Sequence, residues 1–252
     1  MSMRSVAICA VSAAVLGGCG AGEPPARPDP FSATGEMIAW SGGAAGPRAA
    51  CFTCHGLQGE GDGAAAPRLA GLPRGYLSKQ LQDYADGPRR HDAMHAIASR
   101  LPPADRDAVA AWYASLPTPP VRSGGPAPAQ GGRLWHEGDA GRGLRPCAAC
   151  HGRFGEGVGQ AGPPLAGQSA AYVAEELKDW RSGKRQNDPE RVMLKAARPL
   201  TEAELQAVAA YAASLPGAPT ASGAAPATEP WPPGRRPDPR SDASAPPPRA
   251  PE

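Results

Sequence analysis

The sequence predicts an all-α protein that consists of two tandem copies of one small helical domain. Three observations predict this class: a block of residues recurs at a nearly constant offset, each copy carries apolar residues at helical spacing, and no segment alternates like a strand. The 252 residues include 32 glycines and 32 prolines but only 5% aromatic residues. Such a chain offers little bulk for a core, so we expect something other than side chains to fill each interior.

The repeat is anchored by one motif, Cys-x-x-Cys-His-Gly, which occurs at Cys51–Gly56 and again at Cys147–Gly152, an offset of 96 residues. The same offset relates Tyr76 to Tyr172 and Gly87 to Gly183, and beyond them it grows by three residues. Two copies of one domain, the second with a three-residue insertion, account for these matches. Further matched positions are Pro67 and Pro163, Leu69–Gly71 and Leu165–Gly167, Leu81 and Leu177, Met94 and Met193, Leu101 and Leu200, Val109 and Val208, and Leu116–Pro117 and Leu215–Pro216.

Helical spacing and stop signals divide the two copies into elements. Leu77, Leu81 and Tyr84 predict one helix that Gly87 ends, and the second copy repeats the pattern before Gly183. The last helix of the second copy opens with Thr201 and Glu204 at capping-box spacing. We therefore expect domains at 35–117 and 131–216, a Pro- and Gly-rich linker at 118–130, and a disordered Pro-rich tail at 217–252.

The N-terminus has the features of an export signal. Arg4 precedes a short apolar stretch, Ser5–Gly18, which is too short to span a bilayer. Leu16-Gly17-Gly18-Cys19 resembles the lipobox of bacterial lipoproteins, which implies a signal peptide at 1–18, a lipid anchor on Cys19 and a tether at 19–34. The alternative is an ordinary signal peptide and a soluble periplasmic protein. The net charge of +2 gives no reason to expect nucleic-acid binding.

The repeated motif is the attachment signature of c-type haem. Two thiols one helical turn apart can add to the two vinyl groups of one haem, and the adjacent histidine then faces the iron. We expect two haem c groups, bound covalently by Cys51, Cys54, Cys147 and Cys150, with His55 and His151 as axial ligands. The alternatives are a thioredoxin-like redox pair, which lacks its βαβ context, a zinc site, which lacks a fourth ligand, and a strained disulfide within each motif.

The sixth ligand of each iron decides between electron transfer and ligand chemistry. Met94 and Met193 occupy equivalent positions in the repeat, although the chain has only five methionines. We expect both to ligate iron, which raises the reduction potential and leaves no site for a substrate. Several other residues compete: His95 and His91 in the first copy, and Lys195 and Lys184 in the second.

A further pair of residues sits behind the proximal histidines. Pro67 and Pro163 each follow their histidine by 12 residues and are candidates for the carbonyl that accepts the second ring N–H. Prolines that merely shape the loop would fit the sequence equally well.

From about residue 35 to 216 the chain resembles the cytochrome c-four family, two-domain dihaem proteins of the class I cytochrome c type. The resemblance rests on both haem motifs, the Leu-Ala-Gly segments, the Tyr76 and Tyr172 helices and the two methionine segments. It implies two class I cytochrome c domains, each a small helical fold around one covalently bound haem, with His55 and Met94 on one iron and His151 and Met193 on the other. It also implies that the proline carbonyl acceptors are those of Pro67 and Pro163.

The family implies an electron carrier without substrate turnover, on the periplasmic side of the membrane, between a quinol-oxidising cytochrome bc complex and a terminal oxidase. The main alternative is the haem-carrying subunit of a periplasmic dehydrogenase. A dihaem peroxidase would need an iron with an open or releasable site, which Met94 argues against, and a sensor would need a signalling domain.

Overall fold

The computed structural model describes residues 34–121, 127–159 and 162–217. The expected signal peptide, the Cys19 lipobox, the tether up to residue 33 and the tail from residue 218 lie outside the described residues. Within the described ranges, no helix is both long enough and apolar enough to cross a bilayer.

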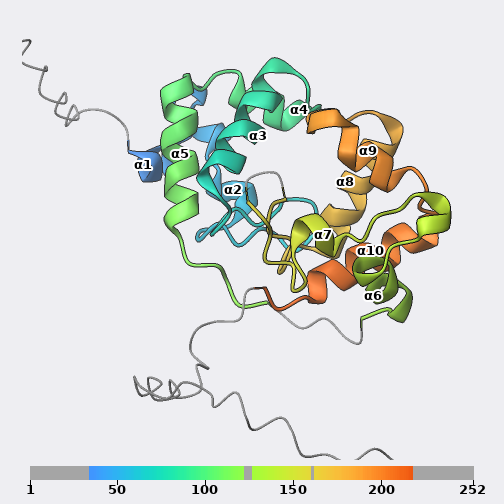
Figure 1. The fold of residues 1–252 in the computed structure, drawn as a ribbon. Coiled ribbons are helices and arrows are strands. Elements are labelled where there is room, and N and C mark those ends of the chain that lie inside the picture. Colours follow the sequence, from blue (N-terminus) through green and yellow to red (C-terminus); the bar gives the residue numbers. More distant parts are fainter. Residues whose placement is uncertain (1–33, 122–126, 160–161, 218–252) are drawn as a thin grey trace, which may run out of the picture.

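The described chain is helical in both halves, as predicted, and contains isolated bridges but no strand (Figure 1). The first half holds α1 (Gly35–Ser41), η1 (Gly43–Ala45), η2 (Pro47–Ala49), α2 (Phe52–His55), α3 (Arg74–Asp86), α4 (Asp92–Ala98) and α5 (Pro103–Ser115). The second half holds α6 (Ala129–His136), η3 (Ala140–Arg142), α7 (Ala148–His151), α8 (Ala170–Ser182), η4 (Pro189–Arg191), α9 (Val192–Ala197) and α10 (Glu202–Ser214).

Each half is closed by a crossing of its first and last helices, α1 on α5 and α6 on α10. Glycine makes both crossings possible. A Cβ on Gly35 would lie 2.1 Å from the carbonyl oxygen of Ala108, and one on Gly131 would lie 2.1 Å from that of Ala207. Neither α1 nor α6 is predicted by the helical spacing of the sequence, and α6 begins at Ala129, inside the expected linker. The sequence does contain a hint of these two helices, because Gly35 and Gly131 are related by the same offset of 96 residues as the haem motifs.

The predicted helix signals act where they were expected. Gly87 and Gly183 adopt left-handed conformations (φ 98° and 79°) at the ends of α3 and α8. Thr201 and Glu204 form a complete capping box at the start of α10. These local interactions set the lengths of the helices that surround each site.

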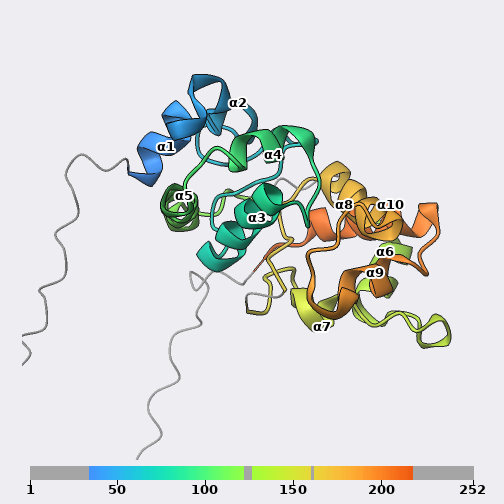
Figure 2. The same ribbon diagram turned by 90° about the horizontal axis from the view of Figure 1, so that it is seen from above.

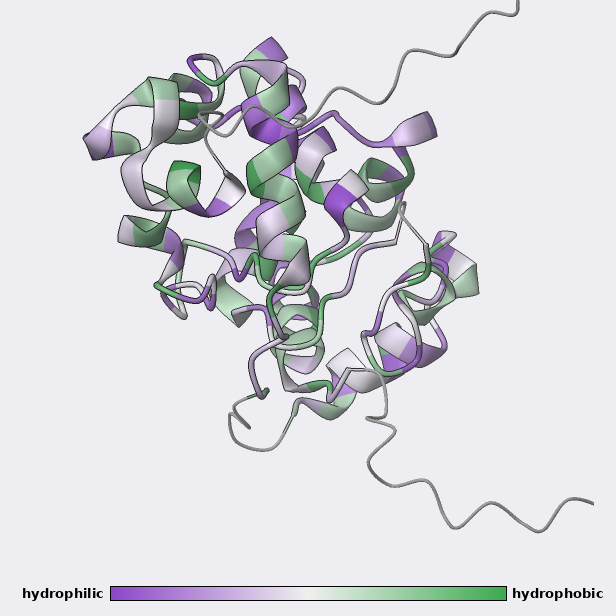
Figure 3. Ribbon diagram, turned by 90° about the vertical axis from the view of Figure 1, so that its left-hand side faces the viewer, coloured by the Kyte–Doolittle hydropathy of each residue, from purple (hydrophilic) through white to green (hydrophobic). Residues whose placement is uncertain are grey.

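Two separate cores correspond to the two halves. Ile38, fully buried, lies in the first core, and Leu134 and Leu205 anchor the second. Figure 3 shows that single helices carry both hydrophobic and hydrophilic residues, as amphipathic helices around a core require. The first core has only eight buried residues, and five of the fourteen buried residues of the second core are alanines, so both cores offer little bulk.

The halves meet along α3, α8 and the segments that follow these helices (Figure 2). Arg89 and Arg185 pair as an isolated antiparallel bridge, so the two equivalent segments meet each other. Gln80 and Glu176, also 96 residues apart, lie between the two arginines. The interface is therefore nearly two-fold, with one copy of each pair from each half.

Candidate functional site: two haem-binding centres

Each haem motif forms a single helical turn, α2 in the first half and α7 in the second. The turn begins after the first cysteine and ends with the histidine. Gly56 and Gly152 follow with φ of 81° and 82°, and a Cβ on either would lie 2.3 Å from the carboxyl group of Glu60 or Glu156. The glycine of the motif is thus needed to turn the chain away from the histidine.

Both proximal histidines are buried and held by one hydrogen bond. The Nδ1–H of His55 donates to the carbonyl oxygen of Pro67 at 2.9 Å, and that of His151 donates to Pro163 at 2.9 Å. Burial lowers the pKa of both imidazoles, and the bond to the proline carbonyl offsets part of this shift. The rings are therefore neutral, and their Nε2 lone pairs are available to a metal.

No disulfide joins the cysteines of either motif. Cys51 and Cys147 are half-buried, and burial raises the pKa of each thiol to about 11, whereas Cys54 and Cys150 are exposed. Zinc is bound by thiolates, and no group of three or more His, Cys, Asp or Glu in the described residues could hold a metal ion. The zinc and disulfide alternatives therefore find no support.

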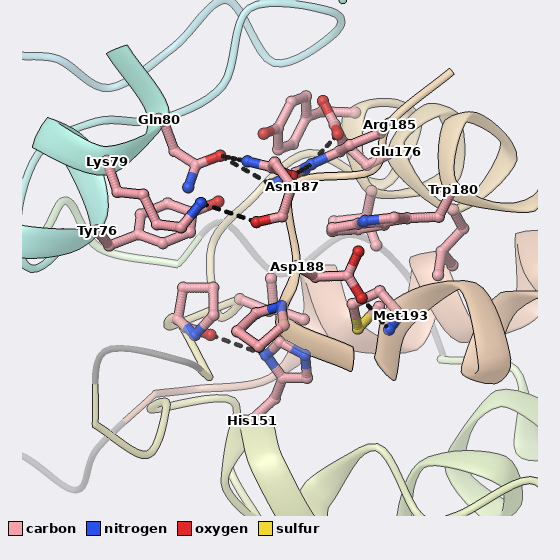
Figure 4. A pocket seen from close by; sticks show the side chains of 16 residues that line it. Tyr76, Lys79, Gln80, His151, Glu176, Trp180, Arg185, Asn187, Asp188 and Met193 are labelled. Atoms are coloured by element: carbon pink, nitrogen blue, oxygen red, sulfur yellow. Dashed lines mark hydrogen bonds and ion pairs between the residues drawn. The ribbon is translucent and has the colours of Figure 1, made fainter. Parts of the chain in front are cut away.

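A cavity of about 270 Å³ opens beside His151 in the second half. Figure 4 shows His151 from α7 and Met193 from α9 facing the same space. The remaining wall is largely apolar and aromatic, with Leu165, Tyr172, Val173, Leu177 and Trp180 among its residues. The structure thus brings together the two side chains that the sequence pairs as ligands of the second iron.

Met193 is placed by the three-residue insertion of the second copy. The insertion forms η4, in which Glu190 and Arg191 both adopt a left-handed conformation with φ of 55°. The chain then enters α9, and the carboxylate of Asp188 accepts a hydrogen bond from the Met193 amide at 2.7 Å. This segment carries backbone strain that the equivalent segment of the first copy lacks.

In the first half, Met94 is half-buried on α4, and its two neighbouring histidines are exposed. His91 Nδ1 accepts from the Met94 amide at 3.3 Å, so its ring proton is on Nε2 and neither nitrogen has a free lone pair. His95 Nδ1 donates to the carbonyl oxygen of Tyr84 at 2.8 Å, which leaves its Nε2 lone pair available. Of the two rivals to Met94, only His95 keeps a tautomer that can bind iron.

The lysine rivals in the second half do not line the cavity. Lys184 is exposed and forms an ion pair with Asp179 at 3.2 Å, and Lys195 is exposed on α9.

Polar atoms at the cavity wall test whether these residues fit a haem, which carries two propionates. The indole N–H of Trp180 is buried and has no hydrogen-bond partner among the described residues. Behind it, Arg89 and Arg185 are both buried and share a single carboxylate, Glu176, so the cluster has a surplus positive charge. The unpartnered Trp180 donor beside a largely apolar cavity fits an apolar ring whose substituents accept hydrogen bonds.

The arginine pair was missed by the sequence analysis. Arg89 and Arg185 obey the offset of 96, as do Gln80 and Glu176, so the repeat contained the signal. The contacts themselves join residues more than 80 positions apart, which no local pattern reveals.

Comparisons with known proteins agree with this geometry. The cytochrome c family model matches residues 42–117 and 140–216. The chain is 44% identical over 188 residues to the thiosulfate dehydrogenase electron acceptor of Stutzerimonas stutzeri (strain A1501), covering 73% of this chain and 87% of that protein.

Two solved structures are also similar. Thiosulfate dehydrogenase (TsdBA) from Marichromatium purpuratum superimposes with a TM-score of 0.64 at 40% identity, over 72% of this chain and 40% of that chain. Reduced cytochrome c4 from Pseudomonas stutzeri superimposes with a TM-score of 0.63 at 32% identity, over 68% of this chain and 96% of that chain. The present chain therefore spans less than half of the first protein and nearly all of the second.

The two motifs and the two matched domains imply two haem c groups. The chain belongs to the cytochrome c family, as a cytochrome c4-like dihaem electron carrier.

Proposed function

We propose that this dihaem cytochrome accepts electrons from a thiosulfate dehydrogenase. The observation that carries the proposal is its 44% identity, over 87% of the relative's length, to a protein named as the electron acceptor of that enzyme. Among the solved structures, the sequence identity is also higher to the thiosulfate dehydrogenase chain, at 40%, than to cytochrome c4, at 32%. The dehydrogenase alternative of the sequence analysis is thus better supported than a link from a cytochrome bc complex to a terminal oxidase.

We further propose the ligands of each haem. Cys51 and Cys54 attach the first haem and Cys147 and Cys150 the second. His55 and Met94 bind the first iron, and His151 and Met193 bind the second; the shared cavity of His151 and Met193 supports the second pair. The carrier works on the periplasmic side, and a lipid on Cys19 would tether it there. Mass spectrometry of the mature chain tests that anchor.

When bound, haem c supplies a reversible one-electron couple at each site. The chain's own residues do the rest. The proline carbonyls fix the orientation and tautomer of His55 and His151, and the largely apolar wall of the cavity beside His151 excludes water there. Methionine ligands would close the sixth position, so that the iron exchanges electrons without binding substrate.

Reduction by the candidate partner tests the proposal directly. Oxidised holoprotein is mixed anaerobically with thiosulfate and a catalytic amount of purified thiosulfate dehydrogenase, and the absorption of reduced haem is followed. We expect rapid reduction of both haems, and only slow reduction when enzyme or thiosulfate is omitted. A parallel reaction uses quinol and a cytochrome bc complex. Rapid reduction there, with none by the dehydrogenase, would overturn the proposal.

A further inference from the structure

One peptide unit connects the proximal ligand of the first half to the second half. Its carbonyl oxygen, that of Pro67, accepts from His55 Nδ1 at 2.9 Å. Its N–H, that of Arg68, donates to the side-chain oxygen of Gln168 in the second half at 3.0 Å. The imidazole of His55, the peptide unit and the amide of Gln168 therefore form one continuous chain of hydrogen bonds across the domain interface.

This series of hydrogen bonds is buried, and the orientation of the Gln168 amide within it is fixed. Arg68 is 3% exposed and Gln168 is 4% exposed. The Gln168 Nε2 donates to the Arg68 carbonyl at 2.8 Å, so the two bonds together determine which end of the amide faces the Arg68 N–H. Arg68 Nη2 also donates to the carbonyl of Ala166 at 3.0 Å, which holds the two segments together.

The second half cannot form this chain. Its equivalent peptide unit joins Pro163 to Pro164, and proline has no N–H. The carbonyl of Pro163 accepts from His151 at the same distance of 2.9 Å, yet nothing can be donated from the other side of that peptide. The residue equivalent to Gln168 in the first copy is Leu72, which is apolar and buried. The hydrogen-bonded series therefore exists for His55, and the missing N–H of Pro164 excludes it for His151.

We infer that Gln168 tunes the first haem through this peptide unit, by strengthening His55 as an electron donor to the iron. A peptide whose N–H donates a hydrogen bond carries more negative charge on its carbonyl oxygen. The Pro67 carbonyl then accepts more strongly from His55, which gives the ring more imidazolate character and favours the oxidised iron. Gln168 is thus a positioning residue that lowers the reduction potential of the haem in the other half. The inference rests on the proposed ligand role of His55 but not on the identity of the redox partner.

The test compares three variants of the holoprotein. Gln168→Leu introduces the residue that the first copy has and removes the acceptor. Gln168→Glu keeps an oxygen acceptor for the Arg68 N–H. Ser169→Ala is the matched control, because it breaks a neighbouring bond between the halves, from Ser169 to the Ala64 carbonyl, without touching the peptide unit. The midpoint potentials of both haems are measured by spectroelectrochemical titration. The variant Met193→His assigns the two waves of the titration to the two haems. Histidine is a stronger ligand than methionine, so this variant should lower the midpoint potential of the second haem only.

We expect Gln168→Leu to raise the midpoint potential of the first haem by ~30–60 mV. For a one-electron couple, this shift corresponds to about a threefold to tenfold increase in the ratio of reduced to oxidised haem at a fixed solution potential. The second haem should not shift, and Gln168→Glu should hold the first haem at or below its original potential. In the reduced protein, the NMR signal of the His55 Nδ1 proton should move upfield in Gln168→Leu alone, as its hydrogen bond weakens. Equal shifts of both haems, the same shift in Ser169→Ala, or no shift in Gln168→Leu would each overturn the inference. These readouts require no dehydrogenase, so their failure is separate from failure of the proposed function.

Discussion

The two halves of the molecule agree closely on the proximal side of each haem site and differ on the distal side. Both histidines end a single helical turn, both are followed by a left-handed glycine, and both donate to a proline carbonyl at 2.9 Å. The methionine segments are built differently. In the first half, the His91 side chain accepts the hydrogen bond from the Met94 amide. In the second half, Asp188 accepts the bond from the Met193 amide, and the strained residues Glu190 and Arg191 lie between them.

The difference teaches which parts of a repeated domain are constrained. Covalent attachment through two thiols, with a histidine directly after the second, restricts the proximal turn to one geometry, and both copies have it. Under the proposed ligation, the distal segment would have only to deliver one thioether, and several loops can do so. The two copies can therefore diverge there, and the same freedom is available at their shared interface.

Removing the cysteines of one motif gives the largest expected effect and tests whether the halves are independent. The double variant Cys147→Ala, Cys150→Ala, and its counterpart Cys51→Ala, Cys54→Ala, should each lose one of the two haems. Each core is small, so the half without haem should also lose its cooperative unfolding. Pyridine haemochrome assay and intact mass measure the haem content. Loss of both haems from either variant would mean that the halves cannot mature separately.

Removing one methionine tests the distal difference. Met193→Ala and Met94→Ala should each remove about half of the absorption band near ~695 nm that marks methionine bound to ferric haem. Each should also lower the potential of its own haem by at least tenfold in the reduced-to-oxidised ratio, ~59 mV. Met37→Ala is the control, because the Met37 side chain is 58% exposed on α1 and lies outside the α4 and α9 segments that carry the two candidate ligands. If Met94→Ala leaves the band intact and His95→Ala alters the spectrum, His95 holds the first iron.

The sequence predicted the parts of the repeat that are marked by distinctive residues, and it missed short helices of the repeat and the contacts between the two halves. The motif, the candidate methionines and the prolines could be singled out because each is a distinctive residue at a repeated position. The helices α1 and α6 were missed because they are only seven and eight residues long, which is too short for a helical period to show in the sequence. The Arg68–Gln168 and Arg89–Glu176 contacts join residues 100 and 87 positions apart, and they depend on how the halves dock.

The interface offers a third comparison, because Glu176 in the second half corresponds to Gln80 in the first. Burial alone would raise the pKa of Glu176, but Arg89 and Arg185 outweigh it and hold the pKa below its ordinary value. Its contribution to docking is therefore present above about pH 5 and is lost as pH falls through the lowered pKa.

Glu176→Gln makes the two positions identical and leaves both arginines without a carboxylate. We expect a loss of about 3 kcal/mol in the free energy of unfolding at pH 7, measured by denaturant titration. Glu175→Gln, an exposed neighbour on the same helix, should change it little. A loss as large in Glu175→Gln as in Glu176→Gln would show that the buried network is not the cause.

The smallest effect concerns the start of the last helix, where the halves differ again. Thr201 caps α10 in a box with Glu204, and Arg142 pairs with that carboxylate, whereas Pro102 at the corresponding position of α5 makes no side-chain cap. Thr201→Ala should therefore cost about 1 kcal/mol in the free energy of unfolding, and Pro102→Ala should not remove any capping bond.

The bond to Arg142, with those to Thr201, lowers the pKa of Glu204 to about 2. Because an unfolded glutamate titrates near ~4.3, the contribution of Glu204 is complete above about pH 5 and falls away between pH ~5 and ~2. Denaturant titrations at neutral and acidic pH should show that the difference between wild type and Thr201→Ala shrinks with acidification. A difference that is unchanged at the lower pH would mean that Thr201 stabilises the helix without the help of Glu204, and that the box contributes no more than a single cap.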